Sequence, residues 1–174
     1  MGRRSSYDFR FLHRLLIFMA CFSICSGFSR EVAAQDSLAK FEAQYELERD
    51  PVAKAKILAK DGLLELEQVR ADLKTDREEQ ALSDLEHYRD EVEMSVKALS
   101  TMGLNAEKHP GGFKELQISL RQTLRRVDDV ITSLPYDKRP WFQAVRSDLA
   151  KAQATLMDQL FPDGGNKGPK RGDP

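Results

Sequence analysis

The spacing of apolar residues along the chain predicts a series of amphipathic helices. Apolar side chains recur at steps of three and four residues, which places them on one face of a helix with 3.6 residues per turn. The most regular row is Phe113, Leu116, Leu120, Leu124, Val127, Ile131 and Leu134. Comparable rows predict helices over residues 51–74, 76–102 and 138–160, and a shorter helix over residues 37–49.

The short connections between the predicted helices, and the absence of the alternating apolar and polar residues that are typical of strands, indicate the fold class. The second and third predicted helices are joined by so few residues that they must fold back on each other as an αα-hairpin. We therefore expect an all-α fold, an antiparallel helical bundle based on αα-hairpins. It would contain three long helices plus a short N-terminal helix.

Polar and small residues mark the expected helix ends. Asp50 is expected to cap a helix that starts at Pro51, since a side-chain oxygen at this position accepts a free backbone N–H. Thr75 or Asp76 is expected to cap the next helix. Gly62 falls in mid-helix, where its missing side chain is expected to let a neighbouring helix approach closely; a functional kink is the alternative.

One stretch carries a family resemblance. Residues 76–88, DREEQALSDLEHY, are similar to the opening of the second helix of a tetratricopeptide unit, with Ala81 as the small packing residue. The resemblance covers one hairpin at most, and the chain contains no further copy of such a unit. It implies a helical hairpin and no binding site.

Residues 1–34 are typical of a secretory signal peptide. Four arginines precede an apolar run over residues 15–28, and the small residues Val32 and Ala34 follow it. The run is too short to cross the hydrocarbon core of a bilayer as a helix. We expect export with cleavage near Ala34. Retention as an anchor and lipid attachment at Cys21 or Cys25 are the alternatives.

Composition bounds what the exported chain could do. Removing residues 1–34 takes away five basic side chains, two acidic ones and both cysteines, which leaves 22 Lys and Arg against 26 Asp and Glu. This balance argues against nucleic-acid binding, and the lack of cysteine excludes disulfides and thiol chemistry. We expect a helical domain over residues 35–161 and a disordered tail rich in Gly, Pro and Lys over residues 162–174.

One set of side chains has the spacing of metal ligands. Asp84, His87 and Glu91 follow one another at steps of three and four, so a helix would project all three from the same face. Carboxylate and imidazole groups on bundle helices bind divalent metals, usually together with ligands from a second helix. A solvent-exposed charged face is the alternative, and no organic cofactor is indicated.

A second set suggests contact with another protein. Arg121 and Arg125 lie one turn apart and could bind a carboxylate or phosphate, unless Asp128, Asp129 or the acidic hairpin neutralises them. Trp141 could anchor a turn or lie at an interface.

No catalytic motif is present, so we do not expect an enzyme. We expect an exported protein that binds another protein of the cell envelope and meets the membrane only during export. A metal- or small-ligand-binding bundle is the alternative function.

Overall fold

The computed structural model describes residues 25–162, with side-chain surroundings from Asp36 onward. The chain divides into two units, one ending at Ala39 and one beginning at Lys40. The helices are α2 (Cys25–Leu47), α3 (Pro51–Asp61), α4 (Leu63–Lys74), α5 (Glu78–Thr101), α6 (Phe113–Ser133) and α7 (Arg139–Leu160). Residues 25–162 contain no strand, so the predicted all-α class is confirmed.

The predicted apolar rows form the core of the second unit. All seven apolar residues of the α6 row are buried, from Phe113 to Leu134. The inward row of α7 is also buried throughout: Phe142, Val145, Leu149, Ala152, Leu156 and Leu160. Asp50 caps α3 as expected, because its Oδ2 accepts a hydrogen bond of 2.8 Å from Ala53 N, and Pro51 is the first helical residue.

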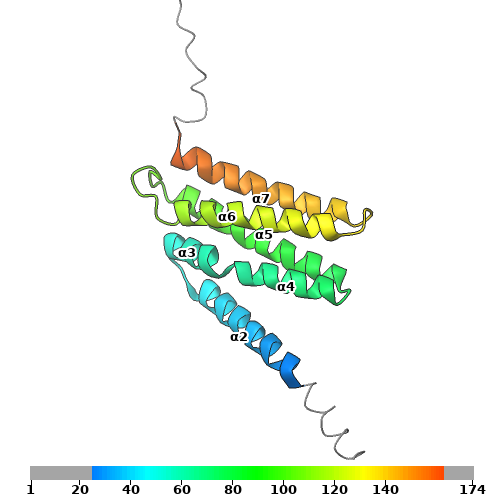
Figure 1. The fold of residues 1–174 in the computed structure, drawn as a ribbon. Coiled ribbons are helices and arrows are strands. Elements are labelled where there is room, and N and C mark those ends of the chain that lie inside the picture. The colour runs from blue at the N-terminus through cyan, green and yellow to red at the C-terminus, as the bar shows by residue number, and fades with distance from the viewer. Residues whose placement is uncertain (1–24, 163–174) are drawn as a thin grey trace, which may run out of the picture. The chain divides into compact units, whose positions relative to one another are not determined.

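The helix expected over residues 51–74 is interrupted at Gly62, which separates α3 from α4 (Figure 1). A Cβ atom at Gly62 would lie 2.6 Å from Leu58 O and 2.9 Å from Tyr88 Cε2. The expected close approach of a neighbouring helix is therefore confirmed at Gly62, where the helix is also interrupted. The first helix also differs from its prediction, because α2 starts at Cys25, well before the expected start at Ser37.

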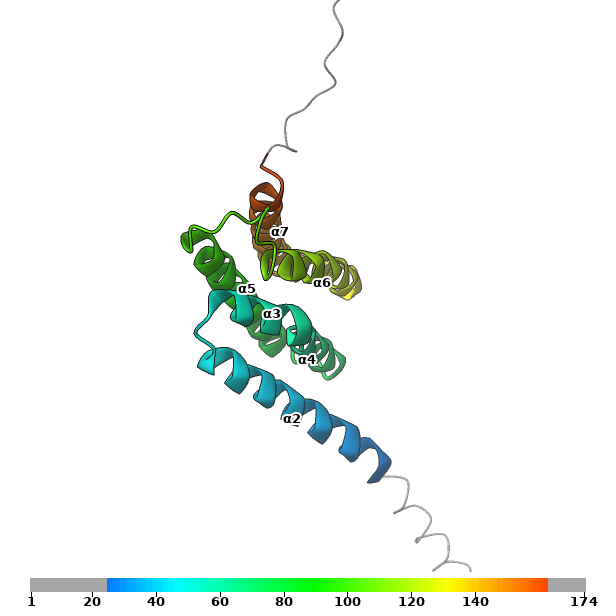
Figure 2. The same ribbon diagram turned by 90° about the vertical axis from the view of Figure 1, so that its left-hand side faces the viewer.

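The helices of the second unit pack in neighbouring pairs. α4 lies against α5, and α6 lies against α7, while α5 also contacts α7 and α3 contacts α6 (Figures 1 and 2). The loop between α5 and α6 returns to the start of α3, where Gly112 adopts φ +82° and lies close to Val52. A side chain at Gly112 would be strained and would crowd the Val52 backbone.

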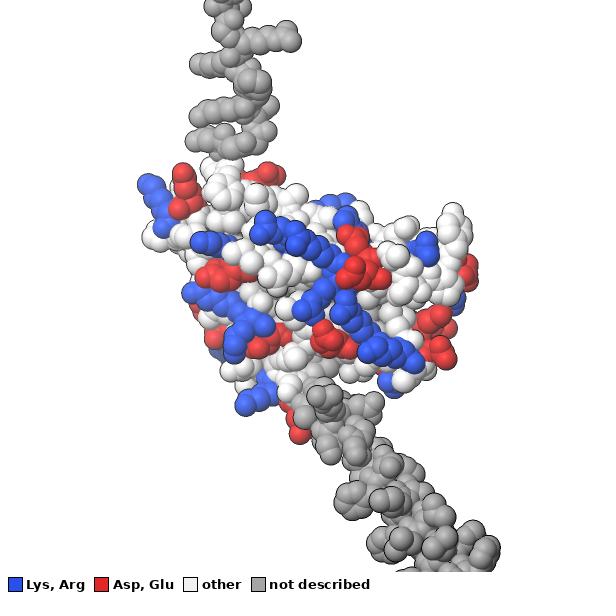
Figure 3. All heavy atoms as spheres, viewed as in Figure 1, with Lys and Arg blue, Asp and Glu red and all other residues white. Residues whose placement is uncertain are grey.

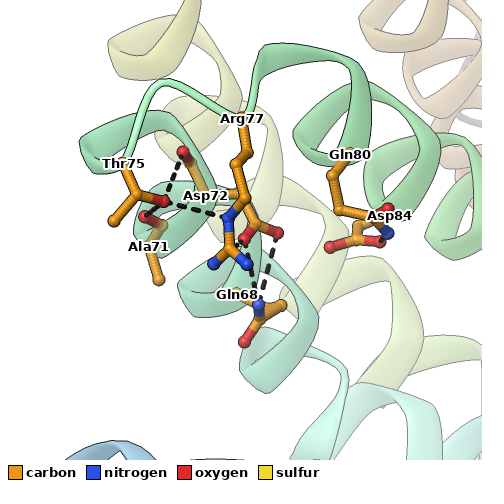
Figure 4. Close-up of polar contacts among 7 residues, drawn as sticks. All are labelled: Gln68, Ala71, Asp72, Thr75, Arg77, Gln80 and Asp84. Atoms are coloured by element: carbon orange, nitrogen blue, oxygen red, sulfur yellow. Dashed lines mark hydrogen bonds and ion pairs between the residues drawn. The ribbon is translucent and has the colours of Figure 1, made fainter.

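The turn between α4 and α5 is held by Asp72, which is fully buried (Figure 4). Its carboxylate forms an ion pair of 2.6 Å with Arg77 and accepts hydrogen bonds from Gln68. The prediction that Thr75 or Asp76 caps α5 is wrong. Arg77 is the N-cap residue, whereas the Thr75 hydroxyl donates back to Asp72 O at the end of α4.

The predicted cleavage point near Ala34 lies within α2, and residues 1–24 of the predicted signal peptide are outside the described residues. Residues 163–174 of the predicted tail are outside them too. Over the described range, no helix combines the length and apolar character that crossing a membrane requires.

Candidate functional site

Two of the three predicted metal ligands come together on α5. His87 Nε2 lies 3.6 Å from Glu91 Oε1, one helical turn away. Asp84 is not part of this group. Its carboxylate accepts a hydrogen bond from Gln80 and approaches the buried Asp72, so it belongs to the polar contacts of the α4–α5 turn (Figure 4).

A third group joins His87 and Glu91 from the neighbouring helix. Glu65, on the first turn of α4, offers a carboxylate oxygen within 4.8 Å of His87 and Glu91 ligand atoms. We call Glu65, His87 and Glu91 the α4–α5 cluster. The cluster exists because α4 and α5 form the hairpin that the short connection predicts.

The two carboxyl groups of the cluster are withdrawn from solvent. Glu65 is 3% exposed and Glu91 is 4% exposed, whereas the His87 side chain is 60% exposed. Apart from the hydrogen bond that a proton shared between the two carboxyl groups provides, both oxygens of Glu65 and Oε2 of Glu91 have no hydrogen-bond partner among the described residues. Uncompensated burial of carboxyl groups is unfavourable, and a shared proton, an ordered water or a bound ion would each offset it.

Burial also changes the protonation of the pair. Burial, reinforced by the negative charge of Glu91, raises the pKa of Glu65 from 4.5 to about 10. Burial raises the pKa of Glu91 as well, while a hydrogen bond from the Glu65 side chain, and then His87 and Lys54, oppose that rise. Two adjacent buried carboxylates resist simultaneous ionisation, so one proton remains on the pair near neutral pH.

Tyr45 of α2 contacts α5 beside Glu91. Its hydroxyl lies 2.9 Å from Glu91 O and 2.8 Å from Ser95 Oγ. Burial raises the pKa of Tyr45 to about 12, so the phenol stays neutral. The Lys54 ammonium stacks on the Tyr45 ring, 4.2 Å from its centroid, and forms no ion pair with Glu65 or Glu91.

The sequence does contain a pattern that indicates Glu65, but the spacing of apolar residues alone does not show it. Glu65 and Asp72 occupy steps of the inward row Leu58, Gly62, Glu65, Val69 and Asp72, all of which are buried. An acidic residue at a position of the buried row is a candidate functional residue, since charged groups are seldom buried without a partner.

The predicted interaction residues on α6 are exposed and free of ion pairs. Neither Arg121 nor Arg125 has a carboxylate within 4.0 Å among residues 36–162. The acids expected to neutralise them are occupied elsewhere: Asp128 pairs with Arg146 and Asp129 with Arg70. Basic and acidic side chains are interspersed on the face of the molecule seen in Figure 3, so no broad region of one charge dominates that face.

Trp141 does not anchor a turn in the described structure. It is 64% exposed at the start of α7, and Tyr136 in the preceding turn is 86% exposed. Burial at that end of α7 is instead provided by Phe142. The two exposed aromatic rings therefore form a second candidate contact surface.

An open depression of about 580 Å³ lies between the α4–α5 turn and the end of α6. Arg70 and Asp129 form an ion pair of 3.7 Å on its wall, and Lys74, Asp76 and Glu78 also line it. These side chains are charged groups of both signs, and Ser133 adds a hydroxyl that donates a hydrogen bond to Val130 O.

Comparisons with protein-family models, with curated proteins and with solved structures find no match. Any function must therefore be argued from the side chains of this chain and their surroundings.

Proposed function

We propose that the protein is exported and acts, without catalysing a reaction, by binding an acidic surface of another cell-envelope protein. The contact surface is the outer face of α6, formed by Ile118, Arg121 and Arg125. These residues follow one another at steps of three and four, so they project from one side of the helix. The antiparallel arrangement of the helices would serve as the rigid support of this surface.

The unpaired state of Arg121 and Arg125 is the observation that carries the proposal. Other arginines on these helices have partners within the fold: Arg126 pairs with Glu67, Arg146 with Asp128 and Arg70 with Asp129. The described part of the fold makes no use of the guanidinium groups of Arg121 and Arg125. Guanidinium groups favour bidentate contacts with carboxylates, and arginine is enriched at protein interfaces.

Ile118 supplies the apolar part of the surface. It is 39% exposed, although most large aliphatic side chains of α6 are buried. An apolar side chain flanked by two arginines suits a partner that offers carboxylates around an apolar patch. The near balance of 22 basic and 26 acidic side chains after residue 34 favours such local recognition over general attraction to a polyanion.

Export is supported by the composition of residues 1–34 and by the position of the unit boundary. The unit that carries the α6 surface begins at Lys40, after the expected cleavage point. Loss of residues 1–34 would therefore leave every residue of that unit in place.

Site-specific photo-cross-linking in cells tests the proposed surface. A photoreactive amino acid at position 118 should give a discrete adduct with an envelope protein. The double substitution Arg121→Glu/Arg125→Glu should abolish this adduct, because it replaces attraction to carboxylates with repulsion. The isolated partner should then bind the purified chain in a salt-dependent manner.

A charge-matched variant provides the control. Arg49 and Lys97 are also exposed and have no carboxylate within 4.0 Å among the described residues. Arg49→Glu/Lys97→Glu changes the net charge by the same amount and should leave the adduct unchanged. Equal loss of the adduct in both double variants would refute the role of α6.

A further inference from the structure

The α4–α5 cluster has the composition of a metal site rather than of a surface ion pair. It combines two carboxylates and one imidazole, which are the oxygen and nitrogen ligands that divalent first-row metals accept. With both carboxylates ionised and His87 neutral, the ligands carry two negative charges, which matches a dication. The three groups come from two helices, which is the usual construction of metal sites in bundles.

The distances within the cluster suit a shared ion. Ligand atoms lie about 2.0–2.2 Å from such an ion, so two ligands in tetrahedral geometry are about 3.4 Å apart. His87 Nε2 and Glu91 Oε1 are already 3.6 Å apart, and all three ligand atoms lie within 4.8 Å of one another. A reduction of the longest separation, at most 4.8 Å, by up to roughly 1.4 Å would complete the set.

Burial of unpartnered oxygens is the independent observation that points to a ligand. Glu65 and Glu91 are each more than nine-tenths buried, and apart from each other three of their four carboxyl oxygens have no hydrogen-bond partner among the described residues. A surface salt bridge would need neither the burial nor the second carboxylate. The exposed His87 places one side of the cluster at the surface of the protein.

We infer that Glu65, His87 and Glu91 bind one divalent first-row transition metal ion, whose remaining coordination positions stay open to water or to an external ligand. The ion replaces the proton that the two carboxyl groups otherwise share. Nearby acids add to the negative field, since Glu42 and Asp84 lie close enough to act on Glu65. Lys54, a basic group that acts on Glu91, opposes it.

Titration of the metal-free protein with Zn²⁺ and Mn²⁺ tests the inference. The chain should be purified from cells expressing the full sequence, without a polyhistidine tag, and stripped with a chelator. Calorimetry should then show one ion bound per chain. Co²⁺ should give the visible absorption of a low-symmetry site. Glu65→Gln, Glu91→Gln and His87→Ala should each weaken binding at least ~10-fold, since even changes to the groups around the ligands reduce affinity by about 10- to 100-fold.

Two matched variants control for nonspecific effects. His109→Ala removes the only other histidine after residue 34, and Asp84→Asn removes the acid that the helical spacing had placed in the site. His109→Ala should bind the ion as the unaltered chain does. Asp84→Asn should weaken binding less than the ligand substitutions do, because Asp84 contributes only its charge near Glu65. Circular dichroism identifies any variant that fails to fold, and the exposed His87 gives a substitution that leaves the core untouched.

Two results would overturn the inference. One is the absence of Zn²⁺ and Mn²⁺ binding up to ~1 mM, which corresponds to a binding free energy of only about −4 kcal/mol. The other is binding that persists in both Glu65→Gln and His87→Ala. In either case the carboxyl pair is a proton-sharing feature of the core.

Discussion

A Cβ atom placed on Gly62 would lie 2.9 Å from Cε2 of Tyr88, so the break between α3 and α4 lies directly against a fully buried ring of α5. The Tyr88 hydroxyl in turn lies 3.1 Å from Thr123 Oγ1 on α6. The missing side chain of Gly62 therefore allows Tyr88 of α5 to pack against the α3–α4 break while its hydroxyl contacts α6. A larger residue at position 62 would disturb this packing.

Gly62→Ala should destabilise the protein by about 1–3 kcal/mol, because the added methyl group overpacks the core. In an open helix the same change would stabilise by up to about 1 kcal/mol through helix propensity. Chemical denaturation distinguishes the two outcomes by their sign. Combining Gly62→Ala with Tyr88→Leu should reduce the penalty, since the contacting ring is then removed.

Arg77→Ala should destabilise the protein by about 2 kcal/mol, because it leaves the buried Asp72 carboxylate without its ion-pair partner. Gln68 retains its hydrogen bonds to Asp72 and limits the loss. Arg89→Ala is the matched control. Its partner Asp90 is largely exposed, so removal of that ion pair should change the free energy of unfolding by less than about 1 kcal/mol. Similar losses in both variants in urea titrations would contradict this account of the turn.

Glu65→Gln should stabilise the metal-free protein at neutral pH. The folded-state pKa of Glu65 is about 10 and exceeds its unfolded value of 4.5. Glu65 therefore contributes its full stabilisation of the folded state below pH 4.5, and this contribution declines as the pH rises toward 10. The free energy of unfolding should fall by at most about 1.4 kcal/mol per pH unit over this range. A glutamine at position 65 does not ionise, so the variant avoids this loss.

Urea denaturation at pH 5 and pH 8, with a chelator present, measures this difference between the unaltered protein and Glu65→Gln. The difference should be small at pH 5 and larger at pH 8. A difference independent of pH would indicate that Glu65 is solvated. Stabilisation together with lost metal binding in Glu65→Gln would separate a ligand role from simple damage to the fold.

Ala34→Leu should block removal of the N-terminal segment, because the processing enzyme requires a small residue directly before the cleaved bond. Mass spectrometry of the unaltered protein recovered outside the cytosol should give an N-terminus at Gln35. Ala33→Leu alters the adjacent position, where size matters less, and should be processed normally. An intact Met1 on the exported protein would indicate an anchor instead.

The sequence predicted those elements whose apolar rows are continuous. α6 and α7 begin and end within one residue of their expected limits, since each has an unbroken inward row and a Gly or Pro near its first turn. α3 and α4 could not be separated from the pattern. The row passes through Gly62 without a change of step, and the break depends on Tyr88 from another helix.

The sequence predicted only two residues of the α4–α5 cluster, His87 and Glu91, because the third comes from another helix. His87 and Glu91 are one turn apart, so local spacing alone places them together. Glu65 precedes both by several helical turns and a loop, and it joins them only when the hairpin closes. Asp84 has the same local spacing, yet Gln80 and Asp72 hold it elsewhere, and no helical period encodes that choice.

The exposed position of Trp141 determines what its fluorescence can report. It is the chain's single tryptophan, and its ring is largely in water while the protein is folded, so unfolding should change the emission wavelength little. A shift toward the blue would instead signal that another molecule has covered the beginning of α7. The emission wavelength of Trp141 should therefore report binding of a partner at the beginning of α7 and should change little when the protein unfolds.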